Sequence, residues 1–271
     1  MNPAKTYYRV LTVAGSDSGG GAGIQADLKT FAACGCYGMS VITALTAQNT
    51  REVSAIHAVP VDFVRAQLDA VLGDIGCDAV KIGMLFSPQL IVEVAEGLRR
   101  HRVRRVVLDP VMVAQSGDRL LQDEAVEALK RHLIPLADLL TPNVPEAETL
   151  LGRPVASAAD MAEAARALVG LGCANALVKG GHLEGGESDD CLYLGGEDRL
   201  LSFSARRIAT TNNHGTGCTL SSAVAAHLAQ GLTVAEAVGR AKDYIGRAIA
   251  AGADYRLGGG HGPVHHFHAF W

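Results

Sequence analysis

A segment of small residues, 212–218, runs directly into a predicted helix and ends on a cysteine. At a helix start, free backbone N–H groups and the positive end of the helix dipole converge and form an anion-binding site. Gly215, Thr216 and Gly217 lie in this segment. A cysteine in this position is expected to have a lowered pKa, so Cys218 can act as a nucleophile or a base. The alternative is a flexible turn followed by a buried thiol.

A glycine-rich segment, 15–23, separates the first predicted strand from the first predicted helix. Glycines let the backbone approach a ligand closely. The spacing fits neither the dinucleotide fingerprint GxGxxG nor a GxxxxGK phosphate loop, which argues against a nicotinamide oxidoreductase. Asp27 lies in the first turn of the following helix and can point at the same site. A tight strand–helix turn is the alternative interpretation.

Two more segments place acidic residues after predicted strands. Asn143 and Glu146 lie three residues apart at a predicted helix start and can share one ligand or metal ion. Asp109 follows another strand and precedes a proline. Both acids also have ordinary interpretations, since Glu146 would stabilise the helix dipole and Asp109 could be a simple turn residue.

A single lysine, Lys179, follows a further buried strand and begins the sequence KGGH. It is either a phosphate partner or a surface lysine. Together the five segments offer an anion site, a lysine, two carboxylates and a glycine-rich loop. This set suits phosphoryl transfer with magnesium, in which the protein mainly positions the reactants and neutralises charge.

The C-terminal segment 261–268 holds four of the ten histidines. The neighbouring segments supply no cysteine and no paired carboxylate, so a metal site is not favoured there. We expect this tail to pack on the protein, with Phe267, Phe270 and Trp271 as anchors.

The predicted elements explain how these distant segments can meet. Short apolar runs alternate with longer amphipathic segments, which is typical of an α/β fold with a mostly parallel sheet. We predict strands at 9–14, 39–44, 53–58, 79–82, 105–109, 139–141, 176–179, 190–194 and 199–203, and helices at 24–34, 61–75, 88–100, 123–133, 161–171, 219–229 and 234–250. No linker divides the chain, so residues 1–271 are expected to form one domain. Ligands of such sheets bind outside the carboxyl ends of the strands.

The composition argues against two classes of partner, nucleic acids and membranes. Of the 271 residues 48% are hydrophobic, the net charge is −4 and aromatics make up 5%, which argues against nucleic acid as a partner. No segment reaches the roughly 18 uninterrupted apolar residues of a membrane helix, so no membrane partner is expected. The six cysteines include no CxxC pair and are expected to be free thiols in a cytoplasmic protein.

Seven motifs are spread along the chain: AGSDSGGGAGIQAD at 14–27, VITALTAQNT at 41–50, KIGM at 81–84, DPVM at 109–112, TPNVPE at 141–146, KGGH at 179–182 and HGTGCT at 214–219. They resemble the hydroxymethylpyrimidine/phosphomethylpyrimidine kinases of thiamine biosynthesis, in the ribokinase-like superfamily. The resemblance implies a central, mostly parallel β-sheet flanked by helices on both faces, usually in a homodimer. It implies transfer of the ATP γ-phosphate to 4-amino-5-hydroxymethyl-2-methylpyrimidine and then to its monophosphate.

The resemblance also implies roles for single residues. The pyrimidine would be bound by Gly15, Asp27, Gln48 and Met84. Within this set Gln48 would hydrogen-bond the ring, and Asp27 would lie near the hydroxymethyl or amino group.

A second set of residues would serve the phosphates. The anion hole would be formed by Gly215, Gly217 and Cys218, and ATP with magnesium would be held by Asp109, Asn143, Glu146, Lys179 and Thr216. Asp109 and Glu146 would hold magnesium through water. With its pKa lowered, Cys218 would take the proton of the hydroxymethyl group, which the second phosphorylation does not require.

Two positions depart from relatives in the superfamily. Cys218 stands where many sugar kinases have an aspartate base, and Gln115 stands where some relatives have a lysine. A pyridoxal or pyridoxine kinase on the same scaffold is the alternative function. A non-catalytic pyrimidine sensor is a third possibility, and the intact anion-hole and lysine positions argue against it.

Overall fold

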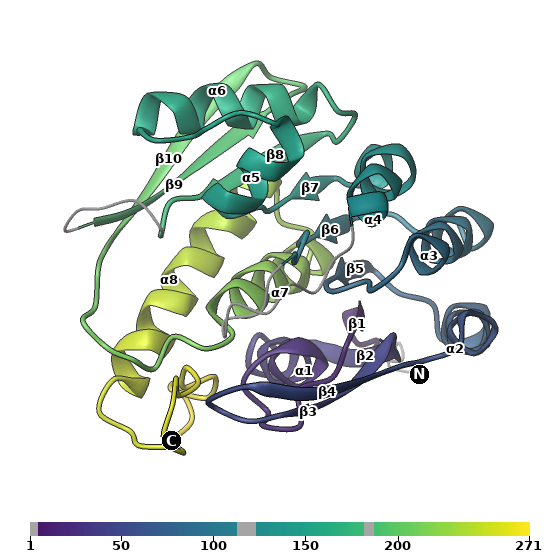
Figure 1. Cartoon of the computed structure of the whole chain (residues 1–271), viewed down its shortest axis with the longest axis horizontal. Helices are drawn as coiled ribbons and strands as arrows, with labels where there is room; N and C mark the ends of the chain where they lie inside the picture. The colour runs from purple at the N-terminus through teal and green to yellow at the C-terminus, as the bar shows by residue number, and fades with distance from the viewer. Residues whose placement is uncertain (1–4, 113–122, 182–186) are drawn as a thin grey trace.

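An eight-stranded sheet forms the centre of the fold, seen in a computed structural model that describes residues 5–112, 123–181 and 187–271 (Figure 1). The strand order is β10-β9-β8-β7-β6-β5-β1-β2. Strand β9 is antiparallel to its two neighbours, and the other pairings are parallel. The strands are β1 (Arg9–Ala14), β2 (Tyr37–Ile42), β5 (Ala79–Ile82), β6 (Val106–Leu108), β7 (Leu139–Leu140), β8 (Asn175–Lys179), β9 (Glu187–Leu194) and β10 (Arg199–Arg206).

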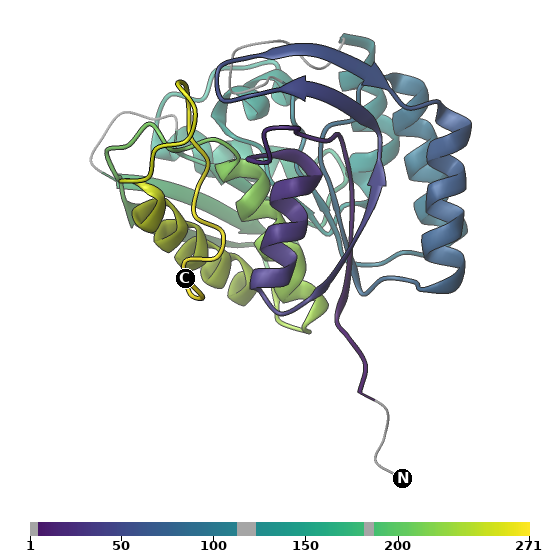
Figure 2. The ribbon, with the colours of Figure 1, turned by 90° about the horizontal axis from the view of Figure 1, so that it is seen from below.

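Helices cover both faces of this sheet (Figures 1 and 2). One face carries α1 (Gly23–Ala33), α7 (Thr216–Ala229) and α8 (Val234–Gly252), and the other carries α2 (Val61–Asp74), α3 (Pro88–Arg100), α4 (Asp123–Ala128), α5 (Val144–Leu151) and α6 (Ala158–Val169). Successive side chains of a strand point to opposite faces. Val106 and Leu108 therefore pack in the α2–α6 core, whereas Val107 packs with Phe31 and Val224 on the other side. The predicted α/β class, with helices on both faces, is confirmed.

A separate hairpin stands beside the sheet, formed by β3 (Ala44–Gln48) and β4 (Val53–Ala58). The strand predicted over 39–44 is present as β2, but it covers residues 37–42, because the chain leaves the sheet at Thr43 and Ala44 begins β3. The Thr43 hydroxyl donates to the Met84 carbonyl oxygen at 3.0 Å, and Ser16 N–H donates to the Ala44 carbonyl oxygen at 2.8 Å. These bonds hold the hairpin next to the loop that follows β1.

Local sequence signals set several helix starts as predicted. The Ser87 side chain caps α3 by accepting the Leu90 N–H, and Pro88 follows at the first helical position. Thr233 and Glu236 form the predicted capping box of α8.

Three helices depart clearly from their predicted bounds. Helix α6 begins at Ala158, three residues before the expected start. The helix expected over 123–133 ends at Ala128 and continues as a π-helical turn, Leu129–Leu133, and a short 3₁₀ turn. Pro135 in that 3₁₀ turn has no N–H to donate, and its ring disfavours α-helix in the preceding residues. Helix α7 begins at Thr216, three residues before the expected start, so Cys218 lies inside its first turn.

The C-terminal tail packs on the protein, but of the three expected anchors only Phe267 is half-buried. Phe270 is 66% exposed and Trp271 75% exposed. Val264 and His266 are buried instead, and His266 Nε2 lies 3.1 Å from the Thr219 hydroxyl. All six cysteines are free thiols, as predicted. Within the described ranges, no helix combines the length and the apolar character needed to cross a bilayer.

Candidate active site

The predicted site residues gather at one edge of the sheet. Strands β1, β5, β6, β7 and β8 run parallel, so the loops after their carboxyl ends lie side by side. Helix α7 packs against β1, β5 and β6 (Figure 1). Its amino end lies at the edge of the sheet where the loops after these strands gather. This arrangement brings the glycine-rich loop, Asp109 and Lys179 near the start of α7.

The glycine-rich loop is organised by Asp17, a residue that the sequence analysis did not single out. Its carboxylate accepts the backbone N–H groups of Gly19, Gly21 and Ala22 at 2.8–2.9 Å, and His214 Nε2 lies 2.9 Å away. Burial by itself would raise the pKa of Asp17, but these hydrogen bonds outweigh it and the pKa is lowered. Asp17 is therefore an ionised acceptor that closes the loop.

Asp27 does not line an open pocket, which corrects the expectation of direct substrate contact. It is fully buried, and Lys81 Nζ lies 3.0 and 3.1 Å from its two oxygens. The hydroxyls of Thr12 and Ser222 donate to the same carboxylate at 2.6 Å each. A carboxylate has about four acceptor positions, so none remains for a ligand. Asp27 and Lys81 form a buried ion pair beneath the site.

Gly15 and Met84 do meet, as the shared pocket requires. A Cβ on Gly15 would come within 2.5 Å of the Met84 methyl carbon, so no larger residue fits there without a shift. Met84 and Ala44 form a small apolar cluster with Val111. This cluster can pack against one face of a flat ring.

Gln48 ends strand β3 and points toward the start of α7. Its side-chain oxygen, Oε1, lies 3.2 Å from the Thr46 hydroxyl, and its side-chain nitrogen, Nε2, lies 3.4 Å from His214 Nε2. Its backbone N–H donates to the Ser18 hydroxyl at 2.8 Å. Gln48 thus joins the hairpin to both glycine-containing loops.

The first turn of α7 is open at its amino end. Gly215 caps it with φ +79° and offers no side chain to satisfy the first N–H groups. A Cβ on Gly215 would overlap the Gly21 carbonyl oxygen, so the two glycine loops touch here. A Cβ on Gly217 would lie 3.4 Å from Lys179 Nζ, so the lysine ammonium lies against this turn. N–H groups and ammonium together favour a bound anion.

Lys179 is paired with Asp109 at 2.8 Å, and both side chains are nearly buried. Burial opposes the charge, but Asp109 and then Glu146 raise the pKa of Lys179, so it remains an ammonium. The Thr141 hydroxyl, 2.9 Å from the Ser221 hydroxyl, lies beside Asp109 as well. The alternative of a surface lysine is wrong for Lys179, and its pairing with Asp109 was not predicted from the sequence.

Asn143 and Glu146 form a capping box on α5. Asn143 Oδ1 accepts Glu146 N–H at 2.9 Å, and Glu146 Oε2 accepts Asn143 N–H at 2.8 Å. The helix-stabilising interpretation of Glu146 is therefore correct, and Asn143 is the cap that pairs with it. Burial raises the pKa of Glu146 to about 7, with a further rise from Asp109 and an opposing effect of Lys179. A buried carboxyl next to Asp109 and Lys179 remains available for a second role.

The lowered pKa expected for Cys218 is wrong. Burial raises the pKa of its thiol to about 11, although Lys81 acts in the opposite direction. Asp27 and Asp109 add to the rise. Desolvation of a thiolate thus outweighs the helix start, and Cys218 is a neutral thiol near pH 7.

Three site residues escaped the sequence analysis: Asp17, Lys81 and His214. Each lies inside a quoted motif, but each partner lies far away in sequence, 54 residues for Lys81 and 197 for His214. Gln115, which stands where some relatives have a lysine, and His182, the last residue of KGGH, lie outside the described residues.

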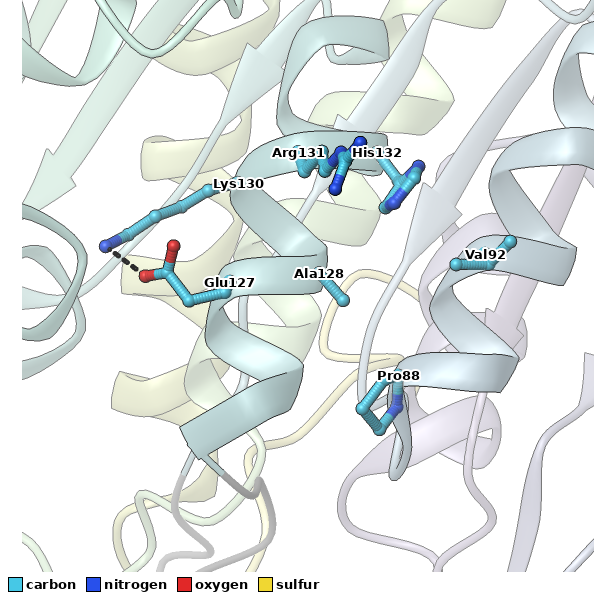
Figure 3. Close-up of a pocket in the computed structure, with 7 residues that line it drawn as sticks. All are labelled: Pro88, Val92, Glu127, Ala128, Lys130, Arg131 and His132. Atoms are coloured by element: carbon cyan, nitrogen blue, oxygen red, sulfur yellow. Dashed lines mark hydrogen bonds and ion pairs between the residues drawn. The ribbon is translucent and has the colours of Figure 1, made fainter.

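A cavity of about 490 Å³ lies elsewhere, between α3 and the segment that follows α4 (Figure 3). It is lined by Pro88, Val92, Glu127, Ala128, Lys130, Arg131 and His132. None of the predicted site residues is among them, so this cavity is separate from the site.

Comparisons with known proteins identify the family of this chain. A family model described as phosphomethylpyrimidine kinase matches residues 17–265. A hydroxymethylpyrimidine/phosphomethylpyrimidine kinase of Rhizobium meliloti is 54% identical over 262 residues, covering 96% of this chain and 97% of that protein.

Solved structures of two kinases match this chain over most of its length. Bacillus subtilis pyridoxal kinase, in a complex with ADP, has a TM-score of 0.89 at 38% identity, covering 96% of this chain and 98% of that one. Clostridium difficile phosphomethylpyrimidine kinase has a TM-score of 0.79 at 46% identity, covering 89% of this chain and 99% of that one. The fold is ribokinase-like, and the chain belongs to the phosphomethylpyrimidine kinase family.

Proposed function

We propose that this protein phosphorylates 4-amino-5-hydroxymethyl-2-methylpyrimidine with ATP, and then phosphorylates the monophosphate, in thiamine biosynthesis. The observation that carries the proposal is the placement of Lys179, paired with Asp109, against the uncapped first turn of α7. Gln48 and the Gly15–Met84 contact lie at the same sheet edge and supply a site for a flat, polar-edged ring.

A coupled assay of ADP release tests this function directly. The purified protein is supplied with ATP and magnesium, and with the pyrimidine, with pyridoxal, or with neither. We expect release with the pyrimidine and, after its phosphate product is isolated, with the monophosphate. ADP release that is equal with and without the pyrimidine would contradict the proposal.

The residues at this edge suit phosphoryl transfer by charge neutralisation. The N–H groups of residues 215–218 would stabilise the transferring phosphoryl group, and the Lys179 ammonium would offset its negative charge. In a loose transition state the acceptor hydroxyl loses its proton late, so a strong base is not required. Cys218 would then contribute through its backbone N–H.

Replacing Cys218 with alanine is therefore expected to slow both phosphorylations by similar factors, each below about tenfold, because a neutral thiol takes no proton. Steady-state kinetics with the pyrimidine and with its monophosphate provide the measurement. A loss of 100-fold or more confined to the first step would restore the thiol as a general base.

Magnesium fits the acidic residues of the site. Across residues 5–112, 123–181 and 187–271, no cluster of three or more histidine, cysteine or acidic side chains could hold a metal. Magnesium is commonly bound by one or two carboxylates together with substrate phosphates and water. Asp109 and Glu146 match that pattern, and bound magnesium would supply charge neutralisation at the ATP phosphates.

The raised pKa of Glu146 predicts a pH dependence for magnesium. Below a pKa of about 7 the side chain is mostly protonated, so the apparent magnesium affinity should rise about tenfold from pH 6 to pH 8. Glutamine also serves in a capping box, so Glu146→Gln keeps the helix start but cannot ionise. Magnesium titrations of turnover at both pH values, for both enzymes, measure the difference; identical pH dependence in the two would exclude Glu146.

Gln48 is proposed to form hydrogen bonds with the polar edge of the pyrimidine. Replacing Gln48 with alanine should weaken pyrimidine binding by about 1–3 kcal/mol, because a ring nitrogen and an amine lose their partner. Gln89→Ala, on the exposed side of α3, is a matched control expected to bind normally. Calorimetry measures both variants, and equal affinities would refute the role of Gln48.

Pyridoxal kinase activity is the second candidate. The ribokinase-like fold of this chain superposes on a pyridoxal kinase with a TM-score of 0.89. Pyridoxal also carries a hydroxymethyl group on a flat ring. The pyridoxal arm of the coupled assay measures this activity.

We further propose that residues 1–271 form one kinase domain that acts as a homodimer in the cytoplasm. The single continuous sheet supports one domain, and six unpaired cysteines suit a reducing compartment. Leu45 and Ala47 of β3 and Ala55 of β4 are exposed on the same face of the hairpin and offer an apolar surface to a second copy. Light scattering should give twice the chain mass of 28.3 kDa, and a monomer mass would contradict the dimer.

A further inference from the structure

We propose that His214 and Thr46 orient the side-chain amide of Gln48, with its oxygen toward His214, and that this order directs the substrate hydroxymethyl group toward the start of α7. The proposal rests on the function proposed above. It makes His214 and Thr46 positioning residues that act through Gln48.

The first step concerns the proton on His214. Asp17 accepts three backbone N–H groups, so it is an acceptor only, and His214 Nε2 lies 2.9 Å from Asp17 Oδ2. The Asp17 carboxylate can only accept a hydrogen bond, so the His214 ring must carry a proton on Nε2 to donate to it. In the structure the same His214 atom lies 3.4 Å from the amide nitrogen, Nε2, of Gln48. That end should therefore be the amide oxygen, since an NH₂ group would place one donor against another.

The second step concerns Thr46 and leads independently to the same orientation. The Thr46 hydroxyl donates its one proton to the Ser16 carbonyl oxygen at 2.9 Å. The structure places Gln48 Oε1 3.2 Å from the same hydroxyl oxygen, which has no second proton to donate to it and can only accept. That end should be the NH₂ group. The two ends of an amide have nearly the same shape, so their assignment follows from these partners.

The third step concerns the substrate. In the pyrimidine, the 4-amino group lies between a ring nitrogen and the carbon that carries the hydroxymethyl group. The amide oxygen accepts from the amino group, and the amide N–H donates to the ring nitrogen. With the oxygen on the His214 side, the hydroxymethyl group also lies on that side. His214 directly precedes Gly215, so the acceptor oxygen is directed to the anion site of α7 and to Lys179. The reverse amide orientation would direct it away.

A neutron crystal structure of the deuterated free protein tests the orientation without any substrate. Deuterium on Nε2 of His214, and an ND₂ group of Gln48 facing Thr46, are expected. An ND₂ group facing His214 would overturn the proposal.

Kinetics test the positioning role. Glutamine places a side-chain N–H where His214 has Nε2–H, whereas methionine offers no donor. We expect His214→Met to raise the KM for the pyrimidine about tenfold with little change in the KM for ATP, and His214→Gln to stay within about threefold of the wild type. In a Gln48→Ala background, His214→Met should add nothing to the pyrimidine KM.

The experiments distinguish failure of the positioning role from failure of the proposed function. An unchanged penalty in the Gln48→Ala background would show that His214 acts only by holding the glycine loop, and would overturn the positioning role. Wild-type protein that shows no pyrimidine turnover would overturn the proposed function and, with it, the assigned direction of the ring. The neutron result decides the amide orientation in either case.

Discussion

Replacing Lys179 with methionine is expected to lower pyrimidine turnover about 100- to 1,000-fold, the size of effect seen when one stabilising group is removed from a transition state. The ammonium lies against the first turn of α7 and is held by Asp109 at 2.8 Å. Without the ammonium, the negative charge of the Asp109 carboxylate would repel the transferring phosphoryl group with no positive charge to offset it. The loss should appear mainly in turnover, with a smaller change in pyrimidine affinity.

The chain offers a closely matched control in Lys242. It pairs with Asp190 at 2.6 Å, and the two side chains are 10% and 3% exposed, against 12% and 2% for Lys179 and Asp109. Lys242→Met breaks a similar ion pair, so both variants should lose similar stability. Only Lys179→Met should lose turnover beyond that. Turnover of the two variants within about threefold of each other would remove Lys179 from catalysis.

Replacing Lys81 with methionine is expected to destabilise the fold by about 3–5 kcal/mol, because it leaves the buried Asp27 carboxylate without its counter-charge. Asp27 and Lys81 are both fully buried, and only the hydroxyls of Thr12 and Ser222 would remain on the carboxylate. Burial opposes the lysine charge, but Asp27 raises the pKa of Lys81, so the pair is ionic at neutral pH. Urea unfolding followed by circular dichroism measures the loss.

Two further variants test whether the stability lost in Lys81→Met comes from the unpaired Asp27 charge. Lys130→Met removes the partner of Glu127, an exposed pair at 2.9 Å, and should cost less than about 1 kcal/mol. Replacing Asp27 with leucine together with Lys81→Met removes both charges, and should recover much of the stability. A single Lys81→Met variant no less stable than Lys130→Met would show that the buried pair is not ionic.

Much of the fold follows from local signals in the sequence. Continuous apolar runs predicted strands β1 and β5 at their observed bounds. The caps at Ser87 and Thr233 predicted two helix starts, because a capping side chain and its N–H partner lie within three residues. The edge of the sheet where the site lies also followed, because ligands of parallel sheets gather at the carboxyl ends of the strands.

The chemistry of single residues could not be predicted in the same way. Asp27 was expected to face the substrate, but Lys81 from β5 and Ser222 from α7 occupy its oxygens. Cys218 was expected to be a thiolate, but burial raises the pKa of its thiol to about 11. Both errors have one cause, since proximity to a helix start is visible in sequence and desolvation is not.

The sequence alone therefore determined the class of fold, the family motifs and the residue types available for phosphoryl transfer. Only the tertiary structure decided which of those residues are exposed to a ligand and which are consumed in supporting contacts. The hydrogen bond between Asp17 and His214 spans 197 residues, and the ion pair of Lys179 with Asp109 spans 70. Such contacts depend on how parallel strands and helix α7 pack together, and packing also sets the desolvation that governs ionisation.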